Sequence, residues 1–213
     1  MAQRTIEVLH DGGDWVVVNK PAGLPVQPGE AVGANLAGEM EAIWGQPPHL
    51  VHRLDRDTAG CLIVGKTRQA AARLAKILSD PGSRKTYHAV VKGIPEDASG
   101  EISETIEVHG VKKRALTRWK LVRQLGEECS LLEIVLDTGR MHQIRIHMAK
   151  KGHPLVGDDR HGDFAFNRRM KREAGAKKLL LVAVRLELSG GIRVEAPWPA
   201  HFSGFCARFP ADP

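Results

Sequence analysis

The sequence is poor in cysteine, and it contains no long apolar run. The 213 residues include three isolated cysteines, Cys61, Cys129 and Cys206, without a CxxC pair, which argues against a disulfide scaffold or a zinc ribbon. We expect them to be small core residues in a reducing compartment. No stretch approaches the roughly 18–20 consecutive apolar residues of a membrane span, and the start, MAQRTIEVLHDGGD, has no apolar export signal. The expectation is a soluble, cytoplasmic, globular protein without a membrane partner.

Aromatic residues are also scarce, at 5% of the chain, and Tyr87 is the only tyrosine. A base-stacking platform of several aromatic side chains is therefore not expected. In the strand-like run around it, Tyr87 shares a face with Ala89 and Val91. Taken alone, this alternation favours a core aromatic and does not exclude a functional one.

Several catalytic signatures are absent as well. The chain has no GxSxG elbow, no GxGxxG fingerprint and no Walker-A loop, which disfavours an α/β-hydrolase, a dinucleotide enzyme and a P-loop NTPase. His142, His147 and His153 do not form an HExxH pattern, and arginines beside Asp55 and Asp57 oppose a magnesium ion there. We expect no metal, which disfavours a metal-dependent nuclease.

What the sequence does have is an excess of positive charge. Its formal net charge is +6 and its pI is about 9.4, which fits a polyanionic partner. Two basic clusters stand out, one between two strand-like runs and one late in the chain: Lys112, Lys113 and Arg114, then Arg168, Arg169, Lys171, Arg172, Lys177 and Lys178. Each could be a solvated loop, but together they favour RNA or DNA over a small anion.

The patterning predicts an α+β fold with a mixed, mainly antiparallel sheet. The length of the chain allows one large domain or two small lobes. Two short strands are expected within Ile6–Asn19, helices at Ala34–Trp44, Thr67–Ser79 and Met141–Lys151, and strands at Cys61–Val64, Lys85–Lys92, Glu101–Val108, Ala115–Arg123, Ser130–Asp137, Leu179–Leu188 and Ile192–Glu195. Four consecutive strands with short polar turns favour antiparallel pairing.

The helix predicted at Met141–Lys151 carries an arginine in an unusual place. At about 100° per residue, Arg145 falls within the apolar stripe of Ile144 and Met148. A guanidinium facing a core is costly unless a carboxylate meets it, so an acidic partner is expected from elsewhere. The alternative is that Arg145 extends to the edge of the stripe. The opposite, polar face is predicted to contain Gln143, His147 and Lys150.

The best candidate for that partner lies in the loop His52–Gly60, HRLDRDTAG, which precedes an apolar strand. Asp55 lies between Arg53 and Arg56, and a carboxylate beside arginine has a lowered pKa and stays ionised as a nucleophile. The alternative is a surface ion-pair cluster in which Asp57 caps the turn. Spacing alone leaves both interpretations open.

Four blocks of the sequence resemble the RluA-type pseudouridine synthases. HRLDRDTAG from His52 to Gly60 is similar to the family's HRLDxxTSG signature. GRMHQIRIH from Gly139 to His147, continuing to GHPLVGD at Gly152–Asp158, resembles its GRTHQIRxH and GHPLxGD block. VNKPAGL at Val18–Leu24 and KTYHAVVKG at Lys85–Gly93 resemble two further motifs, and the order of the blocks is the family's.

This resemblance implies isomerisation of uridine to pseudouridine in RNA by one catalytic domain, residues 1–213, with no metal or organic cofactor. Its implied fold is a mixed, mainly antiparallel central sheet flanked by helices and loops, with an RNA-binding cleft. It assigns the nucleophile to Asp55, a proton-handling or stacking aromatic to Tyr87, the arginine paired with the aspartate to Arg145, and the side chain that replaces a flipped base to Arg53. With the basic clusters, the residues expected to bind RNA are His52, Arg53, Arg56, Lys112, Lys113, Arg114, Arg140, His142, Arg168 and Arg169.

Two residues depart from the family's pattern. Ala59 stands where serine is usual, and Met141 where threonine or serine is usual. Neither change removes a charged group, so we expect activity to be retained. Because the first motif begins near residue 15, no separate S4-type RNA-binding domain is expected, and the catalytic domain itself holds ribosomal or transfer RNA, as a monomer.

The implied reaction breaks the bond from uracil N1 to ribose C1′, turns the base and rejoins it through C5. A stacked base hides these atoms, so the nucleotide must first leave the stack. Attack at C1′, attack at C6 and a glycal route all remain open. The competing hypothesis is a non-catalytic RNA-binding or ribosome-assembly factor with the same fold.

Overall fold

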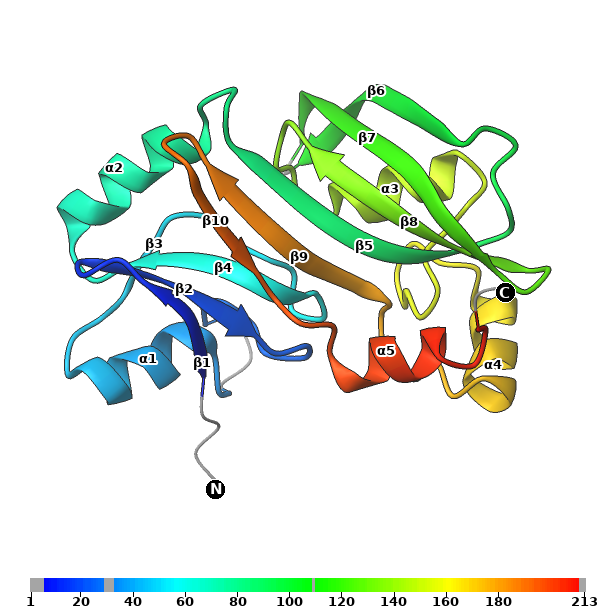
Figure 1. Cartoon of the computed structure of the whole chain (residues 1–213), viewed down its shortest axis with the longest axis horizontal. Helices are drawn as coiled ribbons and strands as arrows, with labels where there is room; N and C mark the ends of the chain where they lie inside the picture. Colours follow the sequence, from blue (N-terminus) through cyan, green and yellow to red (C-terminus); the bar gives the residue numbers. More distant parts are fainter. Residues whose placement is uncertain (1–5, 29–32, 109, 211–213) are drawn as a thin grey trace. The chain divides into compact units, whose positions relative to one another are not determined.

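A computed structural model describes residues 6–28, 33–108 and 110–210 of the chain. These residues divide into two compact units (Figure 1). The first unit comprises the described residues of Met1–Arg84 and Ala183–Pro197, and the second those of Lys85–Val182 and Trp198–Pro213. Whether they act as one catalytic domain stays a prediction.

The first unit is built around a buried strand. Its strands are β1 (Glu7–Asp11), β2 (Trp15–Lys20), β3 (His49–Leu50), β4 (Ala59–Gly65), β10 (Ile192–Glu195) and most of β9 (Leu181–Leu188). They are ordered β1-β2-β4-β9, and β3 and β10 pair with β4 and β9. All seven residues of β4 are buried, which confirms the strand predicted at Cys61–Val64 and extends it. Gly60 has φ 108°, and a Cβ there would lie 2.2 Å from the Ala183 carbonyl oxygen.

Two capped helices complete the first unit. Asn35 caps α1 (Leu36–Trp44) by accepting from the Gly38 N–H, and Thr67 caps α2 (Arg68–Leu78) by accepting from the Ala70 N–H at 3.1 Å. Both helices were predicted, with ends shifted by one or two residues. The core between α2 and the sheet consists of Trp15, Val17, Cys61, Ile63, Leu74, Leu78, Leu186, Leu188, Val194 and Ala196.

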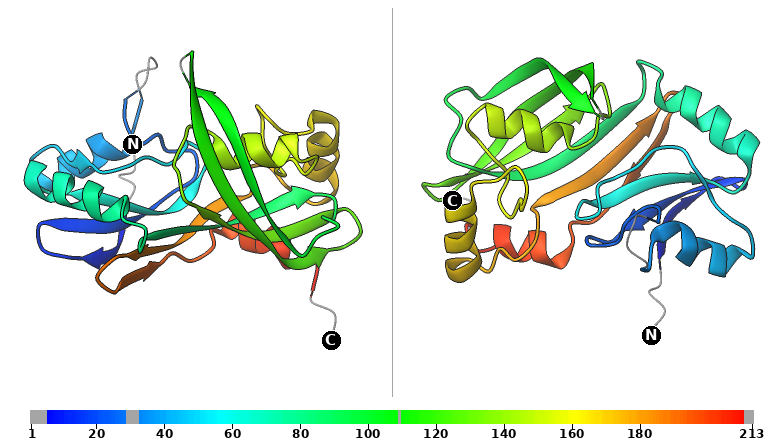
Figure 2. Two further views of the ribbon diagram at one scale, coloured as in Figure 1. Left: turned by 90° about the horizontal axis from the view of Figure 1, so that it is seen from above. Right: turned by 180° about the vertical axis from the view of Figure 1, so that it is seen from behind.

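The second unit contains a long antiparallel sheet. Its strands are β5 (Arg84–Lys92), β6 (Ser99–Val108), β7 (Val111–Leu125) and β8 (Cys129–Leu136), in the order β5-β8-β7-β6. All three neighbouring pairs are antiparallel, as predicted. Figure 2 shows β6 and β7 as a long ribbon. The helices of the unit are α3 (Gln143–Lys150), α4 (Phe164–Glu173) and α5 (Ala200–Cys206).

The structure corrects one predicted strand boundary that affects a basic cluster. Lys112, Lys113 and Arg114 were expected between two strands, but they lie within β7, because the pairing with β6 continues to Val111. Strand pairing therefore fixes the backbone from which these exposed side chains extend, and they do not belong to a loop.

Two helices, α4 and α5, were not predicted. In α4, the buried residues are only Phe166 and Met170, an i, i+4 pair among charged side chains, which gives too weak an apolar period to identify a helix. The seven-residue α5 begins after Pro199 and contains Gly204, so its composition resembles a loop. The two-residue β3 was also missed.

The three cysteines are buried and unpaired, which confirms their prediction as core residues. Burial raises the pKa of the Cys61 and Cys129 thiols to about 12, so neither is a reactive thiolate at neutral pH. Within the described ranges, the longest and most apolar helices fall short of what crossing a membrane requires.

Candidate active site

The HRLD loop, residues 52–58, connects β3 to β4 in the first unit. Leu54 is buried, Asp55 is half-buried, and Arg53 and Arg56 are exposed. The Thr58 N–H donates to the Asp55 carbonyl at 3.2 Å, which closes a turn. The loop thus anchors itself by Leu54 and leaves both arginines accessible.

The charged residues of this loop include one direct ion pair. The Arg56 guanidinium contacts the Asp57 carboxylate at 3.0 Å, with exposed side-chain fractions of 60% and 29%. The surface ion pair that the sequence left open as an alternative is therefore present, but it involves Asp57 and Arg56. It does not decide the role of Asp55.

A buried lysine supports the loop from within the first unit. Lys20, the last residue of β2, is fully buried, and its Nζ donates to the carbonyl oxygens of Pro21 at 3.0 Å, Leu24 at 2.8 Å and Arg56 at 2.9 Å. The Arg56 carbonyl also accepts from the Gly23 N–H at 2.9 Å. One ammonium group therefore ties the segment after β2 to the HRLD loop.

Burial lowers the pKa of Lys20 to about 7, although the negative charges of Asp57 and Asp55 oppose that shift. Lys20 lies within the VNKPAGL motif, but its role was not predicted from the sequence. The available signal was a single lysine that ends the apolar run of β2, directly before a proline.

His52 was predicted to bind RNA, and its ring accepts a hydrogen bond from the protein backbone. Its Nε2 accepts from the Ile63 N–H at 3.2 Å, so that nitrogen carries no proton in this contact. The bond fixes the start of the HRLD loop against β4. RNA contact by His52 stays a prediction.

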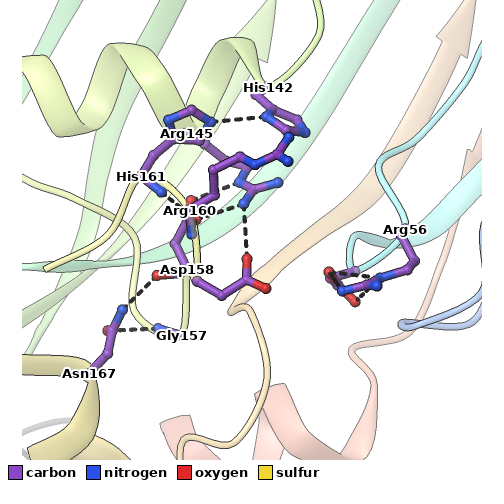
Figure 3. A network of polar contacts seen from close by, with 10 residues as sticks. Arg56, His142, Arg145, Gly157, Asp158, Arg160, His161 and Asn167 are labelled. Atoms are coloured by element: carbon purple, nitrogen blue, oxygen red, sulfur yellow. Dashed lines mark hydrogen bonds and ion pairs between the residues drawn. The ribbon is translucent and has the colours of Figure 1, made fainter. Parts of the chain in front are cut away.

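In the second unit, α3 begins at Gln143 and not at Met141 as predicted. His142 precedes it in the left-handed region at φ 56°, the one non-glycine residue with positive φ in the described part of the chain. Its Nδ1 lies 2.9 Å from Nε2 of His161 (Figure 3). The turn before α3 is thus a strained segment stabilised by a histidine pair.

The prediction of a polar face on this helix is wrong for two residues. Gln143 and His147 are buried, at 2% and 0% exposure. The Gln143 amide donates to the Leu116 carbonyl and to Thr117 Oγ1, while His147 Nδ1 lies 2.9 Å from the same hydroxyl. A wheel cannot foresee this, because β7 supplies polar partners on that side. Burial lowers the pKa of His147.

Arg145 is buried, and its partner within the second unit is Asp158. Nε and Nη2 donate to the two carboxylate oxygens at 2.7 Å each, and the exposed fractions are 5% and 0% (Figure 3). Asp159 lies further away, at 3.4 Å. The alternative that Arg145 extends to the edge of its helix is therefore wrong.

Asp158 is itself held by the backbone. The N–H groups of Arg160 and His161 both donate to its Oδ1 at 2.9 Å. Burial alone raises the pKa of this carboxyl, but the hydrogen bonds from Arg145 and the two N–H groups outweigh burial and lower it. Asp55 was expected to be the partner of Arg145, and no role was predicted for Asp158, which lies within the GHPLVGD motif. Asp55 belongs to the other unit, so its contact with Arg145 stays a prediction.

The basic residues expected to bind RNA differ in their surroundings. Arg140 Nε donates to the Arg114 carbonyl at 3.3 Å, which brings these two predicted residues together. Arg168 is exposed on α4, whereas Arg169 forms a bidentate pair with Glu128 at 2.7 Å. Arg169 is thus engaged in an ion pair, while Arg168 is accessible.

Tyr87 lies in β5 opposite Ile134 of β8 and is 7% exposed. Its neighbours on the same face, Ala89 and Val91, are fully buried. This burial agrees with a core aromatic and with one positioned at the edge of a site, so its catalytic role stays a prediction.

The described residues contain no group of three or more histidine, cysteine, aspartate or glutamate side chains placed to hold a metal ion. The chemistry that the two units offer comes from carboxylates, arginines, a buried lysine and histidines. Such groups can provide a nucleophile, orient it and bind phosphates.

Relatives of the chain point to one family. It is 34% identical to an uncharacterised RNA pseudouridine synthase of Synechocystis sp. over 92% of this chain and 67% of that protein. Identity is 31% to ribosomal large subunit pseudouridine synthase C of Haemophilus ducreyi, over 100% and 72%, and 30% to tRNA pseudouridine synthase C of Pectobacterium carotovorum, over 98% and 64%. The chain thus spans about two thirds of the length of these relatives.

A solved structure shares the fold. Human RNA pseudouridylate synthase domain containing 4 superposes with a TM-score of 0.78 at 22% identity, over 95% of this chain and 92% of that one. This likeness confirms the predicted α+β fold with a mainly antiparallel sheet.

The sequence model of RNA pseudouridylate synthase matches residues 14–150, which is more than half of the chain and includes the HRLD loop, Tyr87 and α3. The sequence relatives and the family model agree with the resemblance of the four blocks, and they favour a catalytic protein over a non-catalytic RNA-binding factor. The chain belongs to the RNA pseudouridylate synthase family.

Proposed function

We propose that this protein isomerises uridine to pseudouridine in structured RNA, ribosomal or transfer, with Asp55 as the nucleophile. The observation that carries the proposal is the set of hydrogen bonds by which the buried Lys20 holds the backbone of the HRLD loop. Because the Lys20 Nζ bonds the Arg56 carbonyl of the loop as well as the Pro21 and Leu24 carbonyls of the segment after β2, the backbone next to the half-buried Asp55 is held in place. A fixed nucleophile needs less ordering in the transition state.

The first step is to take the target uridine out of its stack, at a free-energy cost of a few kcal/mol. Arg53 is exposed beside Asp55, and its planar guanidinium is suited to stacking between the neighbouring bases. It offsets part of the cost by filling the vacancy.

Asp55 then reacts with the flipped nucleotide. Its carboxylate attacks ribose C1′ or C6 of the ring, or removes a ribose proton to give a glycal. All three routes break the bond between uracil N1 and ribose C1′ and allow the base to rejoin the ribose through C5. Arg145 is proposed to orient this carboxylate and keep it charged, and its own guanidinium is held by Asp158. Tyr87 is proposed to pack on the uracil face and to assist proton loss from C5.

The nature of the RNA is proposed from two further observations. One relative is named for the large ribosomal subunit and another for tRNA. The exposed basic residues Lys112, Lys113, Arg114 and Arg168 provide phosphate contacts, so affinity is expected to fall steeply with salt. Both RNAs occur in the cytoplasm, where the protein is proposed to act as a monomer without metal or organic cofactor.

The test compares two neighbouring carboxylates. Asp55→Asn is expected to abolish product while RNA binding is retained, because the amide cannot act as a nucleophile. Asp57→Asn removes the same charge two residues away and should keep most of the activity. Product is detected by carbodiimide modification and primer extension on ribosomal and transfer RNA from cells that lack the gene.

Normal turnover by Asp55→Asn would refute the assignment of the nucleophile. Binding without any product in the unmodified protein, on both RNA fractions, would instead support the non-catalytic factor.

A further inference from the structure

A pocket of about 300 Å³ lies in the second unit between α4 and the turn Gly157–Asp159. Its size is at the lower end of the range for small-ligand sites, roughly 300–1,000 Å³. Its lining includes Asp159, Phe164, Asn167, Arg168, Lys171 and Lys177.

The face of α4 that borders this pocket is not the face that serves the core. Phe166 and Met170 are the buried residues of the helix. Phe164 is 54% exposed and stands at i, i+4 and i+7 with Arg168 and Lys171, so one face presents an aromatic ring and two cations. An exposed phenylalanine flanked by cations suits a base with its phosphates better than an apolar ligand.

The pocket wall is already rigid. Asn167 Oδ1 accepts from the Gly157 N–H at 2.9 Å, and its Nδ2 donates to the Asp158 carbonyl at 2.8 Å (Figure 3). Gly157 has φ 78°, and a Cβ there would lie 2.1 Å from the Lys178 carbonyl oxygen. Because the same turn contains Asp158, the wall is continuous with the support of Arg145.

The positive charges on α4 and in the segment after it divide into two groups. Arg169 and Arg172 pair with Glu128 and Glu173 at 2.7 and 2.8 Å. Among the described residues, the cations that line the pocket, Arg168, Lys171 and Lys177, form no such pair and are exposed. They remain accessible to phosphates.

The carboxylate of Asp159 also borders the pocket, and its side chain is 71% exposed. A negative group in the lining disfavours a bare phosphate there and accepts N–H donors from a base. The lining therefore suits a nucleobase inside and phosphates around it.

We propose that this pocket binds one unstacked nucleotide of the substrate RNA, other than the uridine that is isomerised. Its base stacks on Phe164, and its flanking phosphates contact Arg168, Lys171 and Lys177. The identity of the ligand as substrate RNA rests on the proposed function, whereas the site itself is read from the pocket.

The test measures binding of fluorescein-labelled oligocytidine, which contains no uridine and is not turned over, and of a blunt G·C duplex of the same length. Phe164→Ala is expected to weaken oligocytidine binding about 5- to 150-fold, the range for loss of one base stack. Duplex binding should stay unchanged, because its bases are already stacked, and Phe164→Trp should retain single-strand affinity.

Two variants on the same helix isolate the charge. Lys171→Gln should lower oligocytidine affinity and reduce its salt dependence, whereas Arg172→Gln, which removes a cation outside the pocket, should change neither. Unchanged affinity in Phe164→Ala, an equal loss on the duplex, or equal effects of the two charge variants would each overturn the subsite.

Failure of the proposed function has a different signature. If the intact protein makes no pseudouridine yet Phe164→Ala still weakens oligocytidine binding selectively, the subsite stands and the catalytic proposal fails. If product forms normally and Phe164→Ala binds as before, only the subsite fails.

Discussion

In each unit, the described residues include an arginine that pairs with an aspartate of a turn. In the HRLD loop, Arg56 and Asp57 are adjacent in sequence and pair at the surface, with exposed side-chain fractions of 60% and 29%. In the second unit, Arg145 and Asp158 are thirteen residues apart and pair in the interior, with exposed fractions of 5% and 0%.

The two pairs differ in the hydrogen bonds that hold the surrounding backbone and side chains. The buried pair satisfies its own charges, since the Asp158 carboxylate receives Arg145 and two backbone N–H groups. In the HRLD loop, Arg53 and Arg56 are exposed and Asp55 is half-buried, and the Lys20 Nζ bonds a backbone carbonyl of the loop. The buried ion pair fixes the Arg145 guanidinium, whereas the hydrogen bond from Lys20 holds the backbone of the HRLD loop without engaging the loop's charged side chains.

The largest effect is expected from Asp158→Asn. It leaves the Arg145 guanidinium buried without a compensating charge, and loss of one partner of a buried pair costs about 3–5 kcal/mol. Urea unfolding should show that loss in the free energy of unfolding, together with a large drop in pseudouridine formation. Asp159→Asn is the matched control, because that carboxylate is exposed and makes only a longer contact with Arg145, at 3.4 Å, so the variant should cost under about 1 kcal/mol. Equal losses in the two variants would contradict a special role for Asp158.

A smaller loss is expected from Lys20→Met, which keeps the length of the side chain but removes its donors. Three carbonyl oxygens then lose the Lys20 donor, although the Arg56 oxygen keeps the Gly23 N–H, and we expect a decrease in the free energy of unfolding of about 2–3 kcal/mol. If Lys20 supports the HRLD loop, activity should fall more than RNA affinity. A variant that loses stability but keeps its turnover rate per folded molecule would show that the loop positions Asp55 without Lys20.

Because the pKa of Lys20 is lowered, its contribution to the free energy of unfolding is expected to depend on pH. The folded protein releases this proton near pH 7, whereas an ordinary lysine in the unfolded chain holds it to about 10.5. Between these values the unfolded state binds more protons, so the contribution of Lys20 to stability rises with pH, by at most about 1.4 kcal/mol per unit. The stability difference between the unmodified protein and Lys20→Met should therefore widen from pH 7 to pH 9. A constant difference would contradict the lowered pKa.

Much of the fold was predictable because its signals are local. Thr67, at which the predicted helix begins, caps α2, and the strands of the second unit follow their apolar alternation. The helix wheel also identified Arg145 as a buried charge that needs a carboxylate. These predictions depend on the spacing of residues within one helix or strand, which can be read directly from the sequence.

The rest depends on partners that the sequence does not place. Asp158 was quoted in a motif, but its approach to Arg145 follows from the turn after α3. Gln143 and His147 looked solvent-facing because their partner, Thr117, comes from β7. The role of Lys20 needed the HRLD loop to fold back over β2.

The smallest effect on stability is expected from Arg56→Gln. An exposed ion pair contributes about 0–1 kcal/mol, because solvent screens it and both side chains lose freedom in holding it. The free energy of unfolding should hardly change, yet RNA affinity should fall and the slope of its logarithm against salt should decrease by about one unit if Arg56 contacts a phosphate. Asp57→Asn removes the other half of the pair and should leave affinity unchanged or raise it, since one negative charge near the RNA is lost. A stability loss comparable to that of Asp158→Asn would mean that the surface pair, and not Lys20, maintains the loop.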